Sequence, residues 1–418
     1  MRAFLQIVKV ELLGALRSWS VLSFALISAA WILFGPEVLK YDGSEDGAFI
    51  LSVRYLLGIV FGVSIVFFGA LAAGAVSSDR AARRLQLSLI KPVRHGVIAL
   101  ARIAAIAAAG SAVLALSSLL VYLSVGRGRV CDHVYSPCME DPRIGAMRIF
   151  DDCMEKDANF KERVSEIGSR EVLKYLESYV RDTYETIAPG KAASWEFPSV
   201  RSADGALCVR LKLNDLFGRT DTVFGEFSFG GRSGRLENIN KTLIRVPLSQ
   251  AGEGGGSTLT FVNRSKNPVS IQPQRDLHIL VEADGFGWNV FRAWLMMTAV
   301  LAIVVSAGVF LGAALSRGVA VFALMALLFA MVISPATMEE YPDPIESNAI
   351  DRFALMMTEF CADSTASVSR YNPVSQLESG ECVECGEVIS ASLGALLHAV
   401  VFSVLAGVVM LRKNDTGG

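Results

Sequence analysis

Six long apolar stretches interrupt this sequence, and one long polar segment separates the first three from the last three. The stretches are residues 18–34, 55–76, 103–125, 293–315, 319–335 and 388–411. A helix needs about 20 apolar residues to cross the ~30 Å hydrocarbon core of a bilayer, and residues 18–34 and 319–335 are at the short end. Ionisable residues are almost absent from the six cores, and the mean hydropathy is +0.44. Because a helix satisfies its own backbone polar groups in lipid, we expect an α-helical polytopic membrane protein with six transmembrane helices.

The distribution of lysine and arginine predicts the orientation. Both residue types concentrate at the chain start, in residues 77–97, around Arg317 and at the chain end, whereas residues 336–387 contain two arginines and many acids. Basic short loops stay in the cytoplasm, so we expect a multi-pass protein of the cytoplasmic (inner) membrane with both termini cytoplasmic. The predicted organisation is 1–17 interfacial helix, 18–125 spans one to three with a cytoplasmic loop at 77–97, 126–287 extracytoplasmic domain, 288–335 spans four and five, 336–387 extracytoplasmic cysteine-containing loop, and 388–418 span six with the cytoplasmic tail.

Residues 1–17 have the pattern of an amphipathic helix at the membrane interface. Apolar side chains recur at helical spacing, and basic side chains including Arg17 lie on the other side. Glu11 falls on the apolar side, which leaves two interpretations: a solvated exception, or a contact with a basic partner. We expect the apolar run that follows to be an uncleaved span, because the segment before it is too long for a signal peptide and Trp31 and Pro36 follow the small residues.

Residues 126–287 are predicted to form an inserted extracytoplasmic α+β domain. Within it, residues 142–186 carry apolar side chains at helical spacing and indicate two or three amphipathic helices. From Trp195 the period changes to two, with several short strand candidates separated by glycine and asparagine clusters. This pattern predicts an antiparallel β-sandwich over residues 192–284.

All seven cysteines fall in predicted extracytoplasmic segments. That distribution is typical of an oxidising compartment and favours disulfides. We expect Cys361 to pair with Cys382 or Cys385, and Cys131 and Cys138 are further candidates. Cys382 and Cys385 also resemble half of a zinc knuckle, but Cys131 and Cys138 are spaced too widely to be the other half, so no metal site is predicted.

Residues that carry catalysis are sparse. The chain has four histidines, with no paired nucleophile and base, no HExxH zinc motif and no GxSxG elbow. No GxxxxGK[ST] motif occurs, so the chain has no nucleotide site of this type. His398 is the one ionisable residue in mid-span; a structural role or a proton relay would each explain it. We therefore expect no enzyme activity and no cofactor in this chain, and a binding or contact role for the external domain.

The cytoplasmic loop at 77–97 is more apolar than a positive-inside anchor requires. It reads SSDRAARRLQLSLIKPVRHGV, in which a short basic helix ends at Pro92. Its leucines would give a docking face for another protein. The residues that we select as this site are Arg84, Leu85, Leu89, Lys91, Pro92 and Arg94.

This loop resembles the corresponding segment of membrane permease subunits of the ABC-2 type, bacterial six-span members with a large insert between the third and fourth spans. That family has a stretch similar to "E…(G)TL…LL…P(V/I)SR" between its second and third spans; here the stretch runs from Asp79 to Ile98, and Arg102 takes the place of a usual lysine. The N-terminal KVEL and RS segments and GWNVFRA at 287–293 are also similar. Arg84-Leu85-Gln86 replaces the family's Gly-Thr-Leu. Residues 137–186 and the cysteine-containing loop have no counterpart in the resemblance.

The resemblance implies a function that no residue pattern shows by itself. Two permease chains would associate with two separate ABC ATP-binding subunits, which hold the ATP and Mg²⁺, and residues 79–91 would be the coupling helix. The chain would then be the permease subunit of an ATP-driven exporter, with membrane lipid around it and no nucleic-acid partner. Two alternatives stay open: a mechanotransmission subunit that signals to an envelope enzyme, or a membrane scaffold or sensor without an ATPase.

Overall fold

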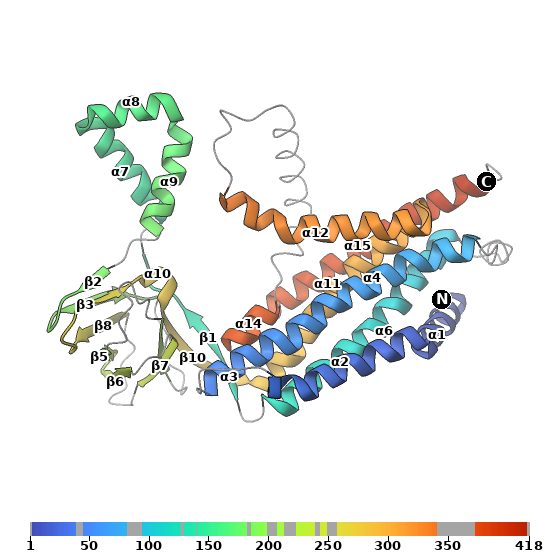
Figure 1. The fold of residues 1–418 in the computed structure, drawn as a ribbon, viewed down its shortest axis with the longest axis horizontal. Coiled ribbons are helices and arrows are strands. Elements are labelled where there is room, and N and C mark those ends of the chain that lie inside the picture. The colour runs from blue at the N-terminus through green and yellow to red at the C-terminus, as the bar shows by residue number, and fades with distance from the viewer. Residues whose placement is uncertain are drawn as a thin grey trace. The chain divides into compact units, whose positions relative to one another are not determined.

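The computed structural model describes residues 2–38, 45–81, 94–126, 129–139, 141–181, 185–198, 207–212, 223–238, 243–248, 257–340 and 373–415. The chain divides into two compact units (Figure 1). The first, called here the helical unit, comprises Met1–Val130, Asp284–Tyr341 and Asn348–Gly418. The second, called the strand unit, comprises Cys131–Ala283 and Pro342–Ser347.

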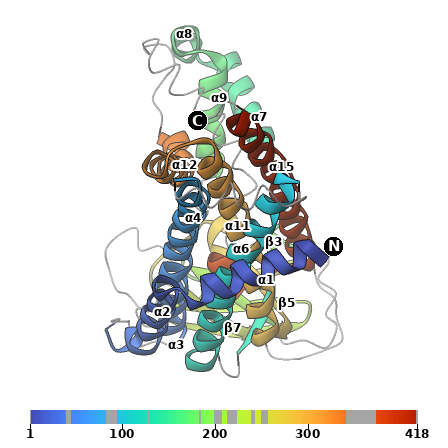
Figure 2. The ribbon, with the colours of Figure 1, turned by 90° about the vertical axis from the view of Figure 1, so that its right-hand side faces the viewer.

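The helical unit is a bundle in which long helices run alongside one another (Figures 1 and 2). Its described elements are α1 (Arg2–Arg17), α2 (Trp19–Val38), α3 (Glu45–Ser52), the π-helix η1 (Val53–Leu57), α4 (Gly58–Ala81), α6 (His95–Ser124), α11 (Phe286–Ala314), α12 (Arg317–Glu340), α14 (Pro373–Ser379) and α15 (Cys385–Asp415). Helix α11 packs against α4, α6 and α15 and forms the centre of the bundle.

Five helices of the described chain are long and apolar enough to cross a membrane. They are Trp19–Val38, Ala48–Ser77, His95–Ser124, Phe286–Ala314 and Cys385–Arg412. The stretch expected as a further span, residues 319–335, lies in α12, which runs from Arg317 to Glu340. Within the described side chains of α12 the apolar segment is Arg317–Phe329. The sixth span stays a prediction.

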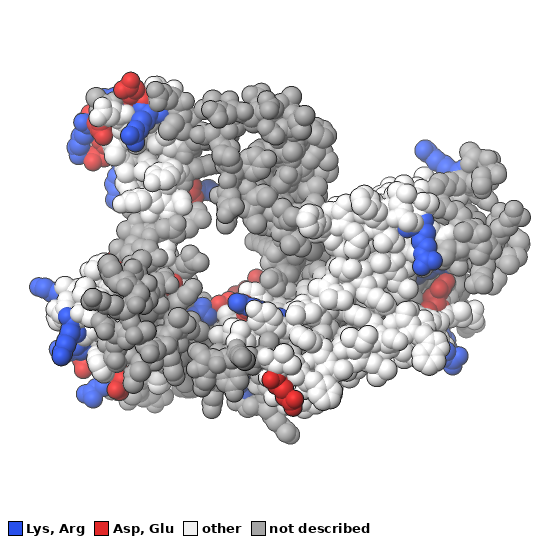
Figure 3. All heavy atoms as spheres, viewed as in Figure 1, with Lys and Arg blue, Asp and Glu red and all other residues white. Residues whose placement is uncertain are grey.

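The outer side chains of the bundle are the kind that an apolar solvent such as lipid would surround. Large apolar side chains are exposed along α2 and α15, among them Leu26, Phe34, Leu393 and Leu396. Figure 3 shows a broad face of the bundle without lysine, arginine, aspartate or glutamate. Since an exposed apolar area of this extent is unusual for a protein in water, these helices belong in a membrane.

Small residues bring α4 and α11 close together. A Cβ added at Gly308 would lie 2.8 Å from the carbonyl oxygen of Gly69, and one at Gly312 would lie 2.3 Å from that of Ala73. Such contacts let two helices approach backbone to backbone, which is how helices associate in lipid, where the hydrophobic effect between them is absent. Phe68 fills the adjacent core and is fully buried.

The described part of the strand unit forms three sheets built mainly from antiparallel pairs. Their strands are β1 (Val130–Tyr135), β2 (Glu185–Ile187), β3 (Ala192–Glu196), β4 (Leu207–Lys212), β5 (Val223–Phe229), β6 (Arg232–Asn238), β7 (Leu243–Leu248), β8 (Thr258–Asn263), β9 (Val269–Ile271) and β10 (Leu277–Gly285), with α10 (Pro273–Asp276) before the last. The order is β1-β10-β4-β7 in one four-stranded sheet, β3-β8-β5-β6 in the other, and β2-β9 in a two-stranded sheet.

One hydrophobic core serves both four-stranded sheets. Alternate residues of β4, such as Val209 and Leu211, are fully buried together with Phe227, Leu259 and Phe261 of the other sheet. In β4 and β10 the register pairs Leu211 with Leu277 and Val209 with Ile279. This alternation is the period of two that the sequence shows from Trp195 onward.

Three further helices lie in the sequence between β1 and β2. They are α7 (Pro142–Lys156), α8 (Ala158–Ile167) and α9 (Ser169–Arg181). Asp141 caps α7 by accepting from the Arg143 backbone N–H at 2.9 Å, and Asp157 caps α8 in the same way. The helical part, expected over 142–186, ends at Arg181, and β2 begins at Glu185.

Candidate functional site

The predicted docking loop, residues 77–97, is described only at its two ends, 77–81 and 94–97. Arg84, Leu85, Leu89, Lys91 and Pro92 lie outside the described residues. Arg94 is exposed and is the N-cap of α6, with extended backbone angles (φ −62°, ψ 135°), and its carbonyl oxygen accepts from the Val97 N–H at 2.9 Å.

A groove lies beside Arg94. It has a volume of about 550 Å³ and runs between the start of α6 and the last turns of α15. Its lining residues are Arg94, His95, Gly96, Val97 and Leu100 of α6, and Val400, Ser403, Val404, Gly407, Val408 and Leu411 of α15. Gly407 permits this close crossing, because a Cβ there would lie 2.8 Å from the Gly96 nitrogen. The groove has apolar walls and one cationic end.

Glu11 contacts a basic residue of the same chain. Its carboxylate accepts from Arg102 Nε of α6 at 3.2 Å. The Arg102 side chain is 5% exposed and that of Glu11 is 39% exposed, so the pair fixes α1 against α6 at the edge of the buried region. Arg17, the other residue singled out in this helix, is exposed in the last turn of α1, where a basic side chain complements the helix dipole.

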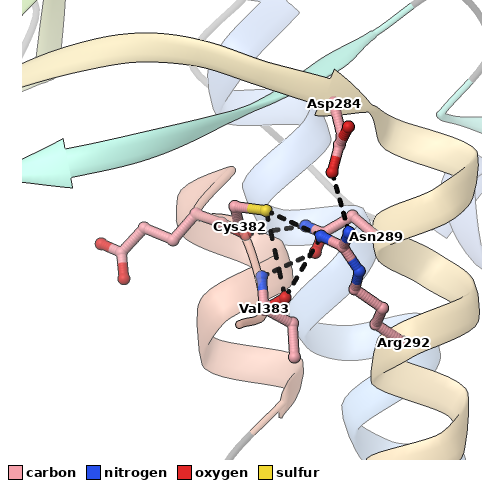
Figure 4. A network of polar contacts seen from close by, with 6 residues as sticks. Asp284, Asn289, Arg292, Cys382 and Val383 are labelled. Atoms are coloured by element: carbon pink, nitrogen blue, oxygen red, sulfur yellow. Dashed lines mark hydrogen bonds and ion pairs between the residues drawn. The ribbon is translucent and has the colours of Figure 1, made fainter. Parts of the chain in front are cut away.

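A second polar cluster joins the start of α11 to the segment that leads into α15 (Figure 4). Asn289 is fully buried. Its amide nitrogen donates to the Glu381 carbonyl oxygen, and its amide oxygen accepts from the Val383 N–H, both at 2.7 Å. One side chain thus satisfies two backbone groups that would otherwise be buried without partners.

Arg292 lies one helical turn further along α11 and points toward the same segment (Figure 4). One terminal nitrogen pairs with Asp284 at 2.9 Å. The other donates to the Cys382 sulfur at 3.2 Å and to the Val383 carbonyl oxygen at 3.4 Å. The Arg292 guanidinium also lies 5.7 Å from the centre of the Trp288 ring. This places a cation beside a buried thiol.

The same segment is tied to η1. Arg54 makes a bidentate ion pair with Glu378 of α14: Nε donates to Oε2 at 2.8 Å and Nη2 donates to Oε1 at 2.7 Å. Within the segment, Gln376 donates to Glu387 of α15 at 2.9 Å. Residues 373–384, called here the clasp, are therefore anchored to both η1 and α11 by charged and amide side chains.

The expected disulfides are absent from the described residues. Cys131, Cys138, Cys153, Cys208, Cys382 and Cys385 are all thiols, and Cys361 lies outside the described residues. Cys131 and Cys138, the further candidates, are therefore not bridged in this structure. Cys131 is buried in β1, whereas Cys138 is exposed three residues beyond that strand. A disulfide needs both Cβ atoms within about 4.5 Å, and compartment alone does not supply that geometry.

Metal-binding and proton-transfer groups were the other candidates. Over the described ranges, no group of three or more histidine, cysteine, aspartate or glutamate side chains is placed to hold a metal ion. His398 directs Nδ1 to the Gly394 carbonyl oxygen of its own helix at 2.7 Å. Since a carbonyl oxygen only accepts, Nδ1 carries the proton, and this bond fits the structural role.

Sequence reasoning missed the clasp contacts of Arg54, Asn289 and Arg292. Charged and amide residues near the ends of apolar stretches are common, so nothing in their spacing distinguished them. Their partners lie far away in the sequence, 324 residues for Arg54 and Glu378. No protein-family model, no curated protein and no solved structure matches this chain.

Proposed function

We propose that this chain is the membrane-spanning permease subunit of an ATP-driven ABC-type exporter. In this proposal the spans number six, with residues 319–335 as the fifth, and the strand unit is an extracytoplasmic β-sandwich domain. A separate ATP-binding subunit holds ATP and Mg²⁺ and docks on the 77–97 loop, and two permease chains form the complex. The resemblance of that loop to ABC-2 permeases is the origin of the proposal.

Among the structural observations, the Glu11–Arg102 ion pair gives the proposal its strongest support. Arg102 lies eight positions after Arg94 (102 − 94), about 12 Å along α6 at 1.5 Å per residue. A displacement applied to the loop would therefore reach α6 within its first turns, and α1 would move with α6 because the ion pair joins them. Burying a charge is costly unless it is paired, and Glu11 supplies the partner that lets Arg102 be buried in α6.

The other end of the loop also leads into the core. Helix α4 enters the loop and packs against α11 through the Gly69, Ala73, Gly308 and Gly312 contacts. Helix α11 in turn packs against α15. Motion at the loop would thus be distributed through the bundle by rigid helices, as coupling to an ATPase requires.

Affinity purification of the tagged chain from its own cells tests the proposal. We expect a co-purifying protein with a GxxxxGK[ST] motif, identified by mass spectrometry, and Mg-ATP hydrolysis by the complex. The variant Leu85→Glu with Leu89→Glu should insert into the membrane and lose this protein. The matched control, Gln86→Glu with Ser88→Glu, adds the same charge to the same loop and should retain it.

Different outcomes separate the alternatives. If the complex hydrolyses ATP in proteoliposomes without moving lipid or solute, mechanotransmission replaces export. If no ATP-binding protein co-purifies with the unaltered chain, the scaffold or sensor alternative holds. If both double variants behave alike, the leucines are not the docking face.

A further inference from the structure

Cys382 of the clasp and Cys385 of α15 flank the point where that helix begins. Cys382 is buried and Cys385, the first residue of α15, is exposed. Two residues separate them, the spacing at which redox-active cysteine pairs occur. Both are thiols in this structure, so the pair has two electrons to give.

Arg292 provides the cation that such chemistry needs. Its Nη1 donates to the Cys382 sulfur at 3.2 Å, and Asp284 holds the other terminal nitrogen at 2.9 Å, which orients the guanidinium (Figure 4). Hydrogen bonds from a charged donor are about twice as strong as neutral ones. In thiol–disulfide exchange, negative charge develops on the attacking and leaving sulfurs, and Arg292 is placed to stabilise that charge on Cys382.

Cys385 is placed to meet an outside reagent. It is exposed, and it occupies the first turn of a long helix, where the dipole favours negative charge. The Glu384 carbonyl oxygen accepts from the Val388 N–H at 3.2 Å, so the helix is formed from that point onward. Residues 382–384 are not helical, and closing the disulfide requires them to form a turn that brings the two α-carbons within 4.4–6.8 Å.

We propose that Cys382 and Cys385 are a reversible dithiol–disulfide pair that exchanges with disulfides of small thiols or of thiol oxidoreductases. The Cys385 thiolate attacks a disulfide RSSR, which forms a Cys385–S–S–R mixed disulfide and releases RS⁻. Cys382 then loses its proton and attacks the Cys385 sulfur, which forms the Cys382–Cys385 bond and releases a second RS⁻. The pair loses two electrons, and RSSR gains them as two thiols.

Oxidation would change the clasp. When the Cys382 sulfur bonds to Cys385, its hydrogen bond from Arg292 must break. The adjacent Val383 N–H is then pulled away from the Asn289 amide oxygen. The state of the thiols would thus set how firmly α11 holds the segment that leads into α15. This inference is independent of the proposed function.

Mass spectrometry of the full-length protein in detergent tests the pair. The protein is equilibrated with mixtures of reduced and oxidised glutathione, quenched in acid, and digested after alkylation of the remaining thiols. We expect the peptide with Cys382 and Cys385 to convert, reversibly, from two alkylated thiols to one internal disulfide. Recovery of both as thiols in the most oxidising mixture, or of a bond from either one to Cys361, would overturn the proposal.

Single variants test the order of attack and the role of Arg292. Cys382→Ser should accumulate glutathione on Cys385, whereas Cys385→Ser should accumulate little on the buried Cys382; the reverse pattern would refute the assigned attack. Arg292→Gln should slow closure of the internal disulfide by about tenfold, the loss expected for one charged hydrogen bond, and Arg292→Lys should recover part of the rate. Equal closure rates in the unaltered protein, Arg292→Gln and Arg292→Lys would exclude Arg292 from the exchange. If Arg292→Gln fails to fold, the closure rate of Arg292→Lys tests the role of Arg292, and the two serine variants test the order of attack.

Discussion

A methyl group at Gly312 measures how closely α11 packs against α4. The Cβ of an alanine there would lie 2.3 Å from the Ala73 carbonyl oxygen and 3.1 Å from its carbonyl carbon. Both atoms belong to the α4 backbone, so no side chain can rotate away. Because real Cβ atoms essentially never come within 3.0 Å of another heavy atom, the helices must separate by at least the difference, 0.7 Å.

The free energy that Gly312→Ala costs the folded protein follows from that separation of the two helices. A gap of 0.5–1 Å removes roughly a quarter to a half of a van der Waals contact, and overpacking of a well-packed core costs about 1–3 kcal/mol. Alanine also favours a helix over glycine by about 1 kcal/mol. Gly62 of α4 provides the matched control, since a Cβ there has no atom within 4 Å and gains the same helix preference without a clash. The difference between Gly312→Ala and Gly62→Ala therefore isolates a packing penalty of about 1–3 kcal/mol.

Thermal unfolding of the full chain in one detergent, followed by tryptophan fluorescence, is the assay. One kcal/mol corresponds to a Tm shift of about 2–4 °C for chains of 150–250 residues, so Gly312→Ala should melt several degrees below Gly62→Ala. Gly308→Ala, whose Cβ would be 2.8 Å from the Gly69 oxygen, should fall between the two. If all three variants melt together, α4 and α11 do not make this contact, and the reasoning is refuted.

Three further predictions concern the strand unit, the clasp and the topology. Phe261→Ala should destabilise the strand unit by about 3–5 kcal/mol, because a fully buried aromatic is lost; the exposed Phe224→Ala should cost far less in the same limited-proteolysis titration. Asn289→Ala should leave two buried backbone groups without partners, at about 1–3 kcal/mol each, and should speed hydrogen exchange of the Val383 amide. The exposed thiol of Cys138 should react with a membrane-impermeant maleimide on intact cells; a requirement for permeabilised cells would invert the predicted orientation.

The long helices were the part of the fold most accessible to sequence reasoning. Hydropathy is a local property, and five of the six apolar stretches lie in helices long enough to span. Residues 319–335 were already at the short end, and they lie in α12, whose described apolar segment is Arg317–Phe329. Strand candidates also followed from local alternation: residues 207–212 and 259–263 lie in β4 and β8. The edge strands β2 and β9 are three residues each, too short for a period of two to be recognised.

The expectation of disulfides was not met among the described cysteines, for a different reason. The distribution of cysteines reports the compartment, whereas a bond depends on the separation and direction of two side chains. Cys131 and Cys138 lie in a segment expected to be extracytoplasmic, and they are not bridged in this structure. The structure also assigns Cys382 a partner that the sequence could not name, the Arg292 guanidinium 90 positions away.

Glu11 and Arg292 together show when a sequence reveals a charge that pairs within the protein. Glu11 stood out because it broke the helical period of an otherwise apolar face, and its partner proved to be a buried arginine of the same chain, 91 residues away. Arg292 broke no pattern, because a cation in the first two turns of a span is ordinary. A local rule detects a charge only where the surroundings should be apolar. At the end of a span, where polar and apolar side chains both occur, the partner is decided by which distant segment the fold brings there, and for Arg292 that segment is the clasp.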